Sequence, residues 1–131
     1  MELKKVDHIA MAVNDMNSAL AIFTNVFNLE VVKQIDQDGL LVSFFRVGDI
    51  LLEIMQPKSD DTKLAEWLIK HGQGLHHVAF MVDDIQTAMS EISNSGVQFE
   101  SSQPLPGANG PIAYMKREST SGIYLQLVQR A

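Results

Sequence analysis

Four polar side chains interrupt apolar stretches of this sequence, and they are of types that hold metal ions. His8 lies in the run VDHIAMAV and His77 in LHHVAFMV, while Glu53 lies in ILLEIM and Gln126 in IYLQLV. A carboxylate in a nearly all-apolar strand is costly to bury unless it has a partner. Imidazole nitrogens with carboxylate and amide oxygens can bind a divalent ion, which would be such a partner.

These four residues occupy related positions, because the chain repeats itself. Residues 6–20 align without a gap onto residues 75–89, which places His8 on His77. Glu53 and Gln126 each stand in the last strand-like run of their copy. Folding two copies about a pseudo-twofold axis would bring all four donors toward one point. We therefore expect one metal site with room for water or substrate oxygens.

The elements that must position these residues follow the pattern βαβββ in each copy. In the opening run, alternation separates a small face from a bulky face, and we expect the bulky face to be buried. The small face carries His8, Ala10 and Ala12, and the bulky face carries Ile9, Met11 and Val13. Apolar residues at helical spacing follow each opening run, and the residues suited to cap these helices are Asn14 or Asp15, and Asp83 or Asp84.

Three strand-like runs follow each of these helices. They are 30–35, 39–47 and 49–56 in the first copy, and 97–101, 111–116 and 122–129 in the second. Between the copies, Ser59, Asp60 and Asp61 are suited to cap a short helix that ends at Gly72.

The chain is predicted to be one α+β domain spanning 1–131. Module one covers about 4–57, a linker helix about 59–72, and module two about 74–130. The two βαβββ modules, related by the pseudo-twofold axis, would form a curved mixed sheet around the metal site.

Three aromatic residues and the two other histidines are expected to have structural roles and not to bind the metal. We expect Phe23, Phe27 and Trp67 to fill the core. His76 should point away from its neighbour His77 because strand side chains alternate, so it is not expected to be a ligand. His71, near a helix end, is interpreted as a surface residue.

Composition excludes several functional classes. The chain has 131 residues, a net charge of −6 and no basic run longer than Lys116-Arg117, so nucleic acid is not an expected partner. It has no cysteine, which excludes disulfides and thiolate ligands and favours a reducing compartment. Residues 1–5 lead into a strand without a secretory pattern, and the most apolar region is interrupted by charges. We expect a cytoplasmic protein that does not enter the membrane.

These motifs resemble the vicinal-oxygen-chelate (glyoxalase/bleomycin resistance/dioxygenase) superfamily and, within it, the methylmalonyl-CoA epimerase family. The resemblance covers nearly the whole chain. It includes the opening D-H-I-A-x-A-V, L-E-I-M-Q-P around Glu53, the segment L-A-E-W-L-I-K-H-G-Q-G-L-H-H-V-A-F-M-V-D-D-I, P-G-A-N-G-P, and S-T-S-G-I-Y-L-Q-L.

The resemblance implies a metal-dependent enzyme with His8, Glu53, His77 and Gln126 as ligands of one Co, Ni, Mn, Zn or Mg ion. The shared chemistry of the family is enolate stabilisation, in which the ion polarises a carbonyl oxygen and a carboxylate removes the neighbouring proton. Glu53 would be this base. The implied reaction is epimerisation of methylmalonyl-CoA or a similar branched acyl-CoA thioester, by a homodimer.

The chain departs from the epimerase pattern at two places. The last-strand position usually carries a Glu with an acid/base role, and here it is Gln126, which cannot take up a proton usefully at neutral pH. Some epimerases pair a Gln in the first copy with a Glu in the second, so Glu53 and Gln126 exchange these roles. Lys116-Arg117 replaces a His-Pro pair that commonly precedes the Ser-Thr-Gly-Gly turn.

Further residues are candidates for substrate binding. Backbone amides in the loop 106–111, which contains Gly107, Asn109 and Gly110, could bind a carboxylate or phosphate, although a simple turn before a strand explains the loop equally well. Lys116 could meet coenzyme A phosphates, or it could be a solvated side chain at a strand end.

Two other functions fit the same fold. One is a glyoxalase I-type lactoylglutathione lyase that acts on adducts of methylglyoxal with a thiol. The other is a non-catalytic antibiotic-binding protein, against which the complete ligand set argues. A ring-cleaving dioxygenase would use two His and one carboxylate, so Gln126 in the fourth place counts against it.

Overall fold

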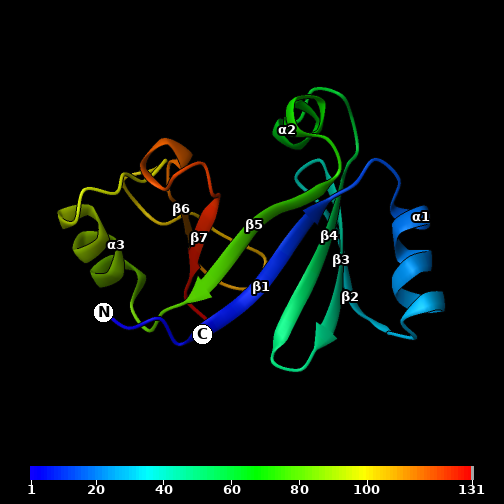
Figure 1. Ribbon diagram of the computed structural model, residues 1–131, viewed down its shortest axis with the longest axis horizontal. Helices are drawn as coiled ribbons and strands as arrows, with labels where there is room; N and C mark the ends of the chain where they lie inside the picture. Colours follow the sequence, from blue (N-terminus) through cyan, green and yellow to red (C-terminus); the bar gives the residue numbers. More distant parts are fainter. Residues whose placement is uncertain (131) are drawn as a thin grey trace. The chain divides into compact units, whose positions relative to one another are not determined.

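The described part of the chain contains seven strands and three α-helices (Figure 1). The computed structural model describes residues 1–130, apart from the side chain of Gln37. The elements are β1 (Lys5–Ala12), α1 (Met16–Ala21), a π-helical turn η1 (Ile22–Val26), β2 (Val31–Gln37), β3 (Leu40–Val47), β4 (Ile50–Pro57), α2 (Lys63–His71), β5 (Gly74–Met81), α3 (Ile85–Asn94), β6 (Ile112–Tyr114), a 3-10 turn η2 (Arg117–Ser119) and β7 (Leu125–Val128). No helix among these is long and apolar enough to span a bilayer.

The strands form one sheet in the order β2-β3-β4-β1-β5-β7-β6. β5 and β7 pair in parallel, whereas β2 with β3, β3 with β4, and β6 with β7 pair antiparallel. The mixed sheet and the α+β class predicted from the sequence are therefore confirmed.

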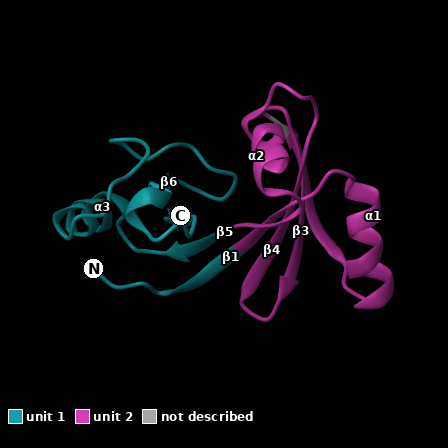
Figure 2. Ribbon diagram, turned by 45° about the horizontal axis from the view of Figure 1, so that its top comes forward, with its two compact units in different colours: residues 1–8, 77–131 teal, residues 9–76 magenta. Residues whose placement is uncertain are grey.

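The chain divides into two compact units (Figure 2). Unit 1 consists of residues 1–8 with 77–131, and unit 2 of residues 9–76. The boundaries differ from those of the sequence copies, because the first residues of the chain belong with its second half. In unit 1 the Lys4 backbone N–H donates to the Met81 carbonyl at 2.8 Å, which ties these two segments together.

In unit 2, β2, β3 and β4 form a meander with two helices packed against it. Asp38 and Gly39 join β2 to β3 with positive φ at both residues, as a two-residue hairpin turn requires. Met16 of α1 packs with Phe45 and Ile54, while the apolar side of α2 packs in a separate cluster around Met55. Because Ile54 and Met55 point to opposite faces of β4, the two helices cover opposite faces.

The helix caps follow the sequence prediction in the two copies but not in the linker. Asp15 accepts from the Asn17 N–H, and Asp84 accepts from two N–H groups in the first turn of α3. The cap of α2 is Thr62, whose hydroxyl oxygen accepts from the Ala65 N–H at 3.1 Å. Residues 59–61, the predicted cap, precede Thr62 in the chain and do not cap the helix. The Ser59 hydroxyl instead donates a hydrogen bond to the Asp61 carboxylate.

Both faces of β1 pack against core clusters, but the small face is more completely buried than the bulky face that was expected to be the buried one. Ala10 and Ala12 are fully buried and pack in the α2 cluster with Met55. Met11, on the other face, is only partly buried. The small side chains let large residues from α2 and β4 pack closely, and these large residues supply the volume of the core.

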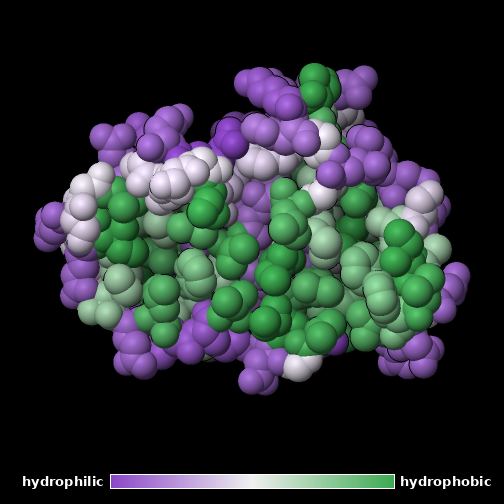
Figure 3. Space-filling model, viewed as in Figure 1, coloured by the Kyte–Doolittle hydropathy of each residue, from purple (hydrophilic) through white to green (hydrophobic). Residues whose placement is uncertain are grey.

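Two further predictions were wrong in detail. The strand predicted at 97–101 is reduced to a single bridge between Phe99 and Met115. Phe27, expected in the core, is 61% exposed, because η1 carries it past the core while Phe23 stacks on Phe45. In Figure 3 apolar residues gather over the region of α1 and η1, consistent with the exposure of Ile22 and Val26.

Candidate metal centre

His8 is a buried residue of β1 whose ring is held by its sequence neighbour. Its Nδ1 lies 2.7 Å from Oδ2 of Asp7. A carboxylate can only accept a hydrogen bond, so Nδ1 carries the proton in this contact. The other ring nitrogen, Nε2, is then left with its lone pair, the form that binds metals.

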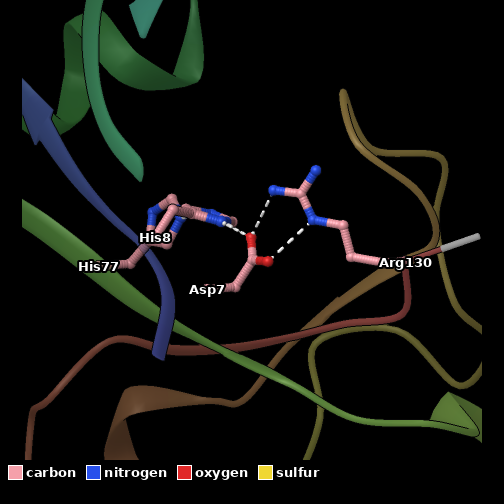
Figure 4. Close-up of polar contacts among 4 residues, drawn as sticks. All are labelled: Asp7, His8, His77 and Arg130. Atoms are coloured by element: carbon pink, nitrogen blue, oxygen red, sulfur yellow. Dashed lines mark hydrogen bonds and ion pairs between the residues drawn. The ribbon is translucent and has the colours of Figure 1, made fainter. Parts of the chain in front are cut away.

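Asp7 is itself buried and paired with Arg130. Oδ1 of Asp7 accepts from Nε of Arg130 at 2.8 Å, and Oδ2 accepts from its Nη2 at 2.9 Å (Figure 4). Burial alone would raise the pKa of Asp7, but the hydrogen bonds from His8 and Arg130 and the guanidinium charge outweigh burial and hold that pKa well below its usual range. The Asp7 carboxyl is therefore ionised at neutral pH.

His77, the repeat partner of His8, brings its ring to the same place from β5. Nε2 of His77 lies 3.2 Å from Nε2 of His8, and the two rings are nearly perpendicular. Both side chains are buried and belong to unit 1. The two histidines that the repeat makes equivalent therefore face each other through their Nε2 atoms.

Gln126 lies on β7, on the sheet face that carries His77. It is the register partner of Ala79 in the parallel pairing of β5 with β7, and Ala79 lies on the same face of β5 as His77. The side chain is only 2% exposed. Among residues 1–130, its Oε1 has no hydrogen-bond donor. A buried amide oxygen left in this way costs about 1–3 kcal/mol unless something else binds it.

Glu53 lies on β4, opposite Phe44 of β3, and is 8% exposed. His8 and His77 in unit 1 and Glu53 in unit 2 are buried side chains of types that bind divalent metal ions.

These residues fit a divalent metal ion. Two nitrogens bound at right angles to one ion, each at about 2.1 Å, are about 3.0 Å apart. The observed 3.2 Å between the Nε2 atoms of His8 and His77 is close to that separation. Nitrogen and oxygen donors without thiolates suit Co, Ni, Mn, Zn or Mg. The unsatisfied oxygen of Gln126 supplies the kind of group that an ion would complete.

An aromatic wall borders His77 within unit 1. The Tyr114 ring meets the His77 ring edge-on at 5.2 Å between centroids and stacks on Tyr124 at 4.7 Å. The Tyr124 hydroxyl donates to the Glu100 carboxylate at 2.9 Å. Burial, followed by the hydrogen bond to Glu100 and its charge, raises the pKa of Tyr124 far above the usual value. Tyr124 is therefore a neutral wall residue, and the guanidinium of Arg117 lies 5.8 Å from its ring centre.

The predicted substrate-binding residues lie in two places of unit 1. Gly107 and Gly110 form a tight turn, where a side chain at Gly110 would collide with the Gln129 carbonyl. This turn, with the start of α3, lines a largely apolar pocket, and Asn109 is half-buried beside it. Lys116 is exposed at the start of η2.

The histidines expected not to be ligands lie elsewhere. The rings of His71 and His76 both contact Trp67, with centroid separations of 4.1 and 4.3 Å. His71 is exposed, as predicted.

Comparison with known proteins identifies the family of this chain. Residues 7–114 match the family model of the Glyoxalase/Bleomycin resistance protein/Dioxygenase superfamily. The chain belongs to this superfamily. The resemblance drawn from the repeat and the ligand pattern is therefore confirmed.

Relatives of this superfamily member include proteins named as epimerases. The chain is 32% identical over 130 residues to the uncharacterized protein YqjC of Bacillus subtilis, covering 97% of this chain and 93% of that one. It is 29% identical to the mitochondrial methylmalonyl-CoA epimerase of Bos taurus, covering 97% and 75%. A solved methylmalonyl-CoA epimerase in complex with methylmalonyl-CoA and NH4+ has the same fold, with a TM-score of 0.92 at 24% identity, covering 99% and 96%.

The sequence reasoning missed the residues that surround the ligand set. Asp7 stands directly before His8, but the residue at the equivalent position of the second copy is His76. The repeat therefore did not single out Asp7 as a functional residue. Arg130 lies 123 positions from Asp7 and only the fold brings the two together. Tyr124 had a usable signal, since it shares a strand face with Gln126 two positions away.

Proposed function

We propose that this protein binds one divalent metal ion through His8, Glu53, His77 and Gln126 and removes a proton next to the carbonyl of an acyl-CoA thioester. The observation that carries the proposal is the facing pair of Nε2 atoms in His8 and His77, 3.2 Å apart. The buried Oε1 of Gln126, which has no donor among residues 1–130, supports it. The epimerases among its relatives favour methylmalonyl-CoA or a similar branched acyl-CoA as substrate.

Each ligand has a distinct part in this chemistry. A bound divalent ion polarises a carbonyl oxygen and lowers the barrier to removing the neighbouring proton. Glu53, the carboxylate of the set, takes the proton from the α-carbon and can return it. Gln126 cannot take up a proton, so it serves as a neutral donor. Tyr114 and Tyr124 would exclude water beside His77.

Of Glu53 and Gln126, only Glu53 can act as a base. We therefore expect proton transfer to be fast on one face of the substrate and slow on the other. Epimerisation requires a proton to leave one face and to return on the other, whereas exchange needs only one base. We therefore expect deuterium from heavy water to enter the α-position of methylmalonyl-CoA faster than the stereocentre inverts, with both followed by NMR.

Replacing the base tests the mechanism. Glu53→Gln keeps an oxygen donor at the ion but removes the proton acceptor, so exchange should slow by roughly two orders of magnitude or more. The metal content of the variant should be measured alongside, to separate loss of the base from loss of the ion. Glu30→Gln, at an exposed position before β2, is the matched control and should exchange at the parent rate. A Glu53→Gln variant that holds metal and exchanges as fast as the parent would place the base elsewhere.

A further inference from the structure

The two histidines of the centre have unequal surroundings, although the sequence repeat makes them equivalent. His8 is preceded by Asp7, whereas His77 is preceded by His76. The Asp7 carboxylate accepts from the His8 ring at 2.7 Å. The ring of His76 instead contacts Trp67 in unit 2. The repeat therefore diverges at the position that sets the orientation of one histidine.

Asp7 is fully engaged by its partners. Oδ2 accepts from both His8 Nδ1 and Arg130 Nη2, and Oδ1 accepts from Arg130 Nε (Figure 4). The planar guanidinium binds both carboxylate oxygens at once, which fixes the plane of the carboxylate as well as its position. The carboxylate is 3% exposed, so water does not offer it alternative partners.

This arrangement determines which nitrogen of His8 can bind an ion. Because both oxygens of Asp7 accept hydrogen bonds and cannot donate, the His8 proton must sit on Nδ1. Nε2 then carries the lone pair, and it lies 3.2 Å from Nε2 of His77. An outer carboxylate of this kind also makes the imidazole a stronger donor to a metal ion.

Arg130 has two effects on Asp7. Its charge balances a buried carboxylate that would otherwise be costly, and its two N–H groups keep the carboxylate turned toward His8. Asp7 lies in β1, the strand that carries His8. Arg130 lies two residues after the end of β7, the strand that carries Gln126. Two ligands of the proposed set are thereby tied to one ion pair.

We propose that Asp7 and Arg130 are positioning residues of the metal centre, holding the His8 ring with its proton on Nδ1 and with the lone pair of Nε2 directed toward His77, where the ion would bind. The inference rests on the proposed function in so far as it concerns a metal. The hold on the His8 proton is a property of the protein alone and can be measured without metal.

The decisive variant is Asp7→Asn, which keeps the shape but supplies a single acceptor oxygen. In either orientation of the amide, one N–H of Arg130 faces the NH2 group instead of an acceptor, so the two-point contact and the ion pair that fix the carboxylate are lost. His8 Nδ1 then no longer faces a fixed anionic acceptor, and its proton can move to Nε2, the nitrogen that would bind the ion. Metal affinity should fall by about 10–100-fold. Arg130→Lys, which loses the two-point contact, should cause a smaller loss.

Two measurements read these effects. The position of the His8 proton is determined by 15N NMR of the metal-free protein at alkaline pH, where free imidazole is neutral. Affinities for Zn²⁺ and Co²⁺ are measured by competition with a chelator, and the visible spectrum of bound Co²⁺ reports the ligand geometry. Met89→Ala is the control, because Met89 lies in the α3 core and its loss lowers stability without touching Asp7.

The expected result is a proton on Nδ1 of His8 in the parent, a larger share of the Nε2-protonated ring in Asp7→Asn, and weaker metal binding in Asp7→Asn than in Met89→Ala. A parent with its proton on Nε2, or an Asp7→Asn variant with parental affinity and Co²⁺ spectrum, would overturn the proposal. If the parent binds no divalent ion, the proposed function fails, while the NMR result still decides whether Asp7 controls His8. If Asp7→Asn does not fold, Arg130→Lys provides the same comparison.

Discussion

The buried side-chain oxygen of Gln126 lacks a hydrogen-bond donor within the described protein, and a bound ion would supply the missing partner. Leaving such an oxygen unsatisfied costs stability, whereas an apolar group of similar shape would avoid the cost. Natural sites accept costs of this kind where a ligand needs the group.

Replacing Gln126 with Leu should therefore separate stability from metal binding. We expect Gln126→Leu to raise the free energy of unfolding of the metal-free protein by about 1 kcal/mol, because the unsatisfied oxygen is removed. The same variant should bind Zn²⁺ more weakly, because a donor is lost. Urea unfolding with and without Zn²⁺ measures both effects.

The matched control is Gln129→Leu, two positions further along. Oε1 of Gln129 accepts from the Ile85 N–H at 2.9 Å, so the same change leaves a helix N–H without that acceptor. This variant should lose about 1 kcal/mol. If both variants lose equal stability, Gln126 is satisfied in solution and the reasoning about its oxygen is incorrect.

At the scale of elements, α2 depends on a cap that differs from the one its sequence suggests. Three polar residues precede Thr62, and each has a side chain able to cap a helix. Only Thr62 reaches the Ala65 N–H, while Ser59 and Asp61 bond to each other. The apolar side of α2 packs in the same cluster as Ala10 and Ala12, on the His8 face of β1.

Thr62→Ala should lower the free energy of unfolding by about 1 kcal/mol, because one N–H of the first helical turn loses its acceptor. Ser59→Ala, which removes an exposed hydroxyl outside the helix, should change stability by less than half as much. Chemical denaturation of both variants checks this. A larger effect for Ser59→Ala would mean that the helix begins earlier than Lys63.

At the scale of the whole molecule, metal binding should appear as added stability. An ion that binds only the folded chain, at about 100 times its dissociation constant, adds about 2.7 kcal/mol. For a chain of this size we expect a rise in Tm of roughly 8 °C, reversed by a chelator. Elemental analysis should find about one ion per chain.

Histidine variants show whether the stabilisation comes from the proposed centre. His8→Ala should abolish most of the metal-dependent rise in Tm. His71→Ala, at an exposed histidine that contacts Trp67, should keep it. Equal behaviour of these two variants would contradict the assignment of His8 as a ligand.

Local patterns in the sequence were sufficient for most of the elements and for the proposed ligands. The repeat placed His8 and His77 at equivalent points, and Asp15 and Asp84 at the starts of two helices. These inferences succeed because strand alternation and helix capping depend on neighbours only a few positions away. The mixed sheet followed from the order of the elements.

Contacts between distant segments were decided only by the tertiary structure. The burial of the small face of β1, the exposure of Phe27 and the shrinking of the 97–101 strand to one bridge depend on what packs or pairs from elsewhere in the chain. The pairing of Asp7 with Arg130 is the clearest case, since 123 positions separate them. A residue type states what a side chain can bind, but the fold alone determines which partner reaches it.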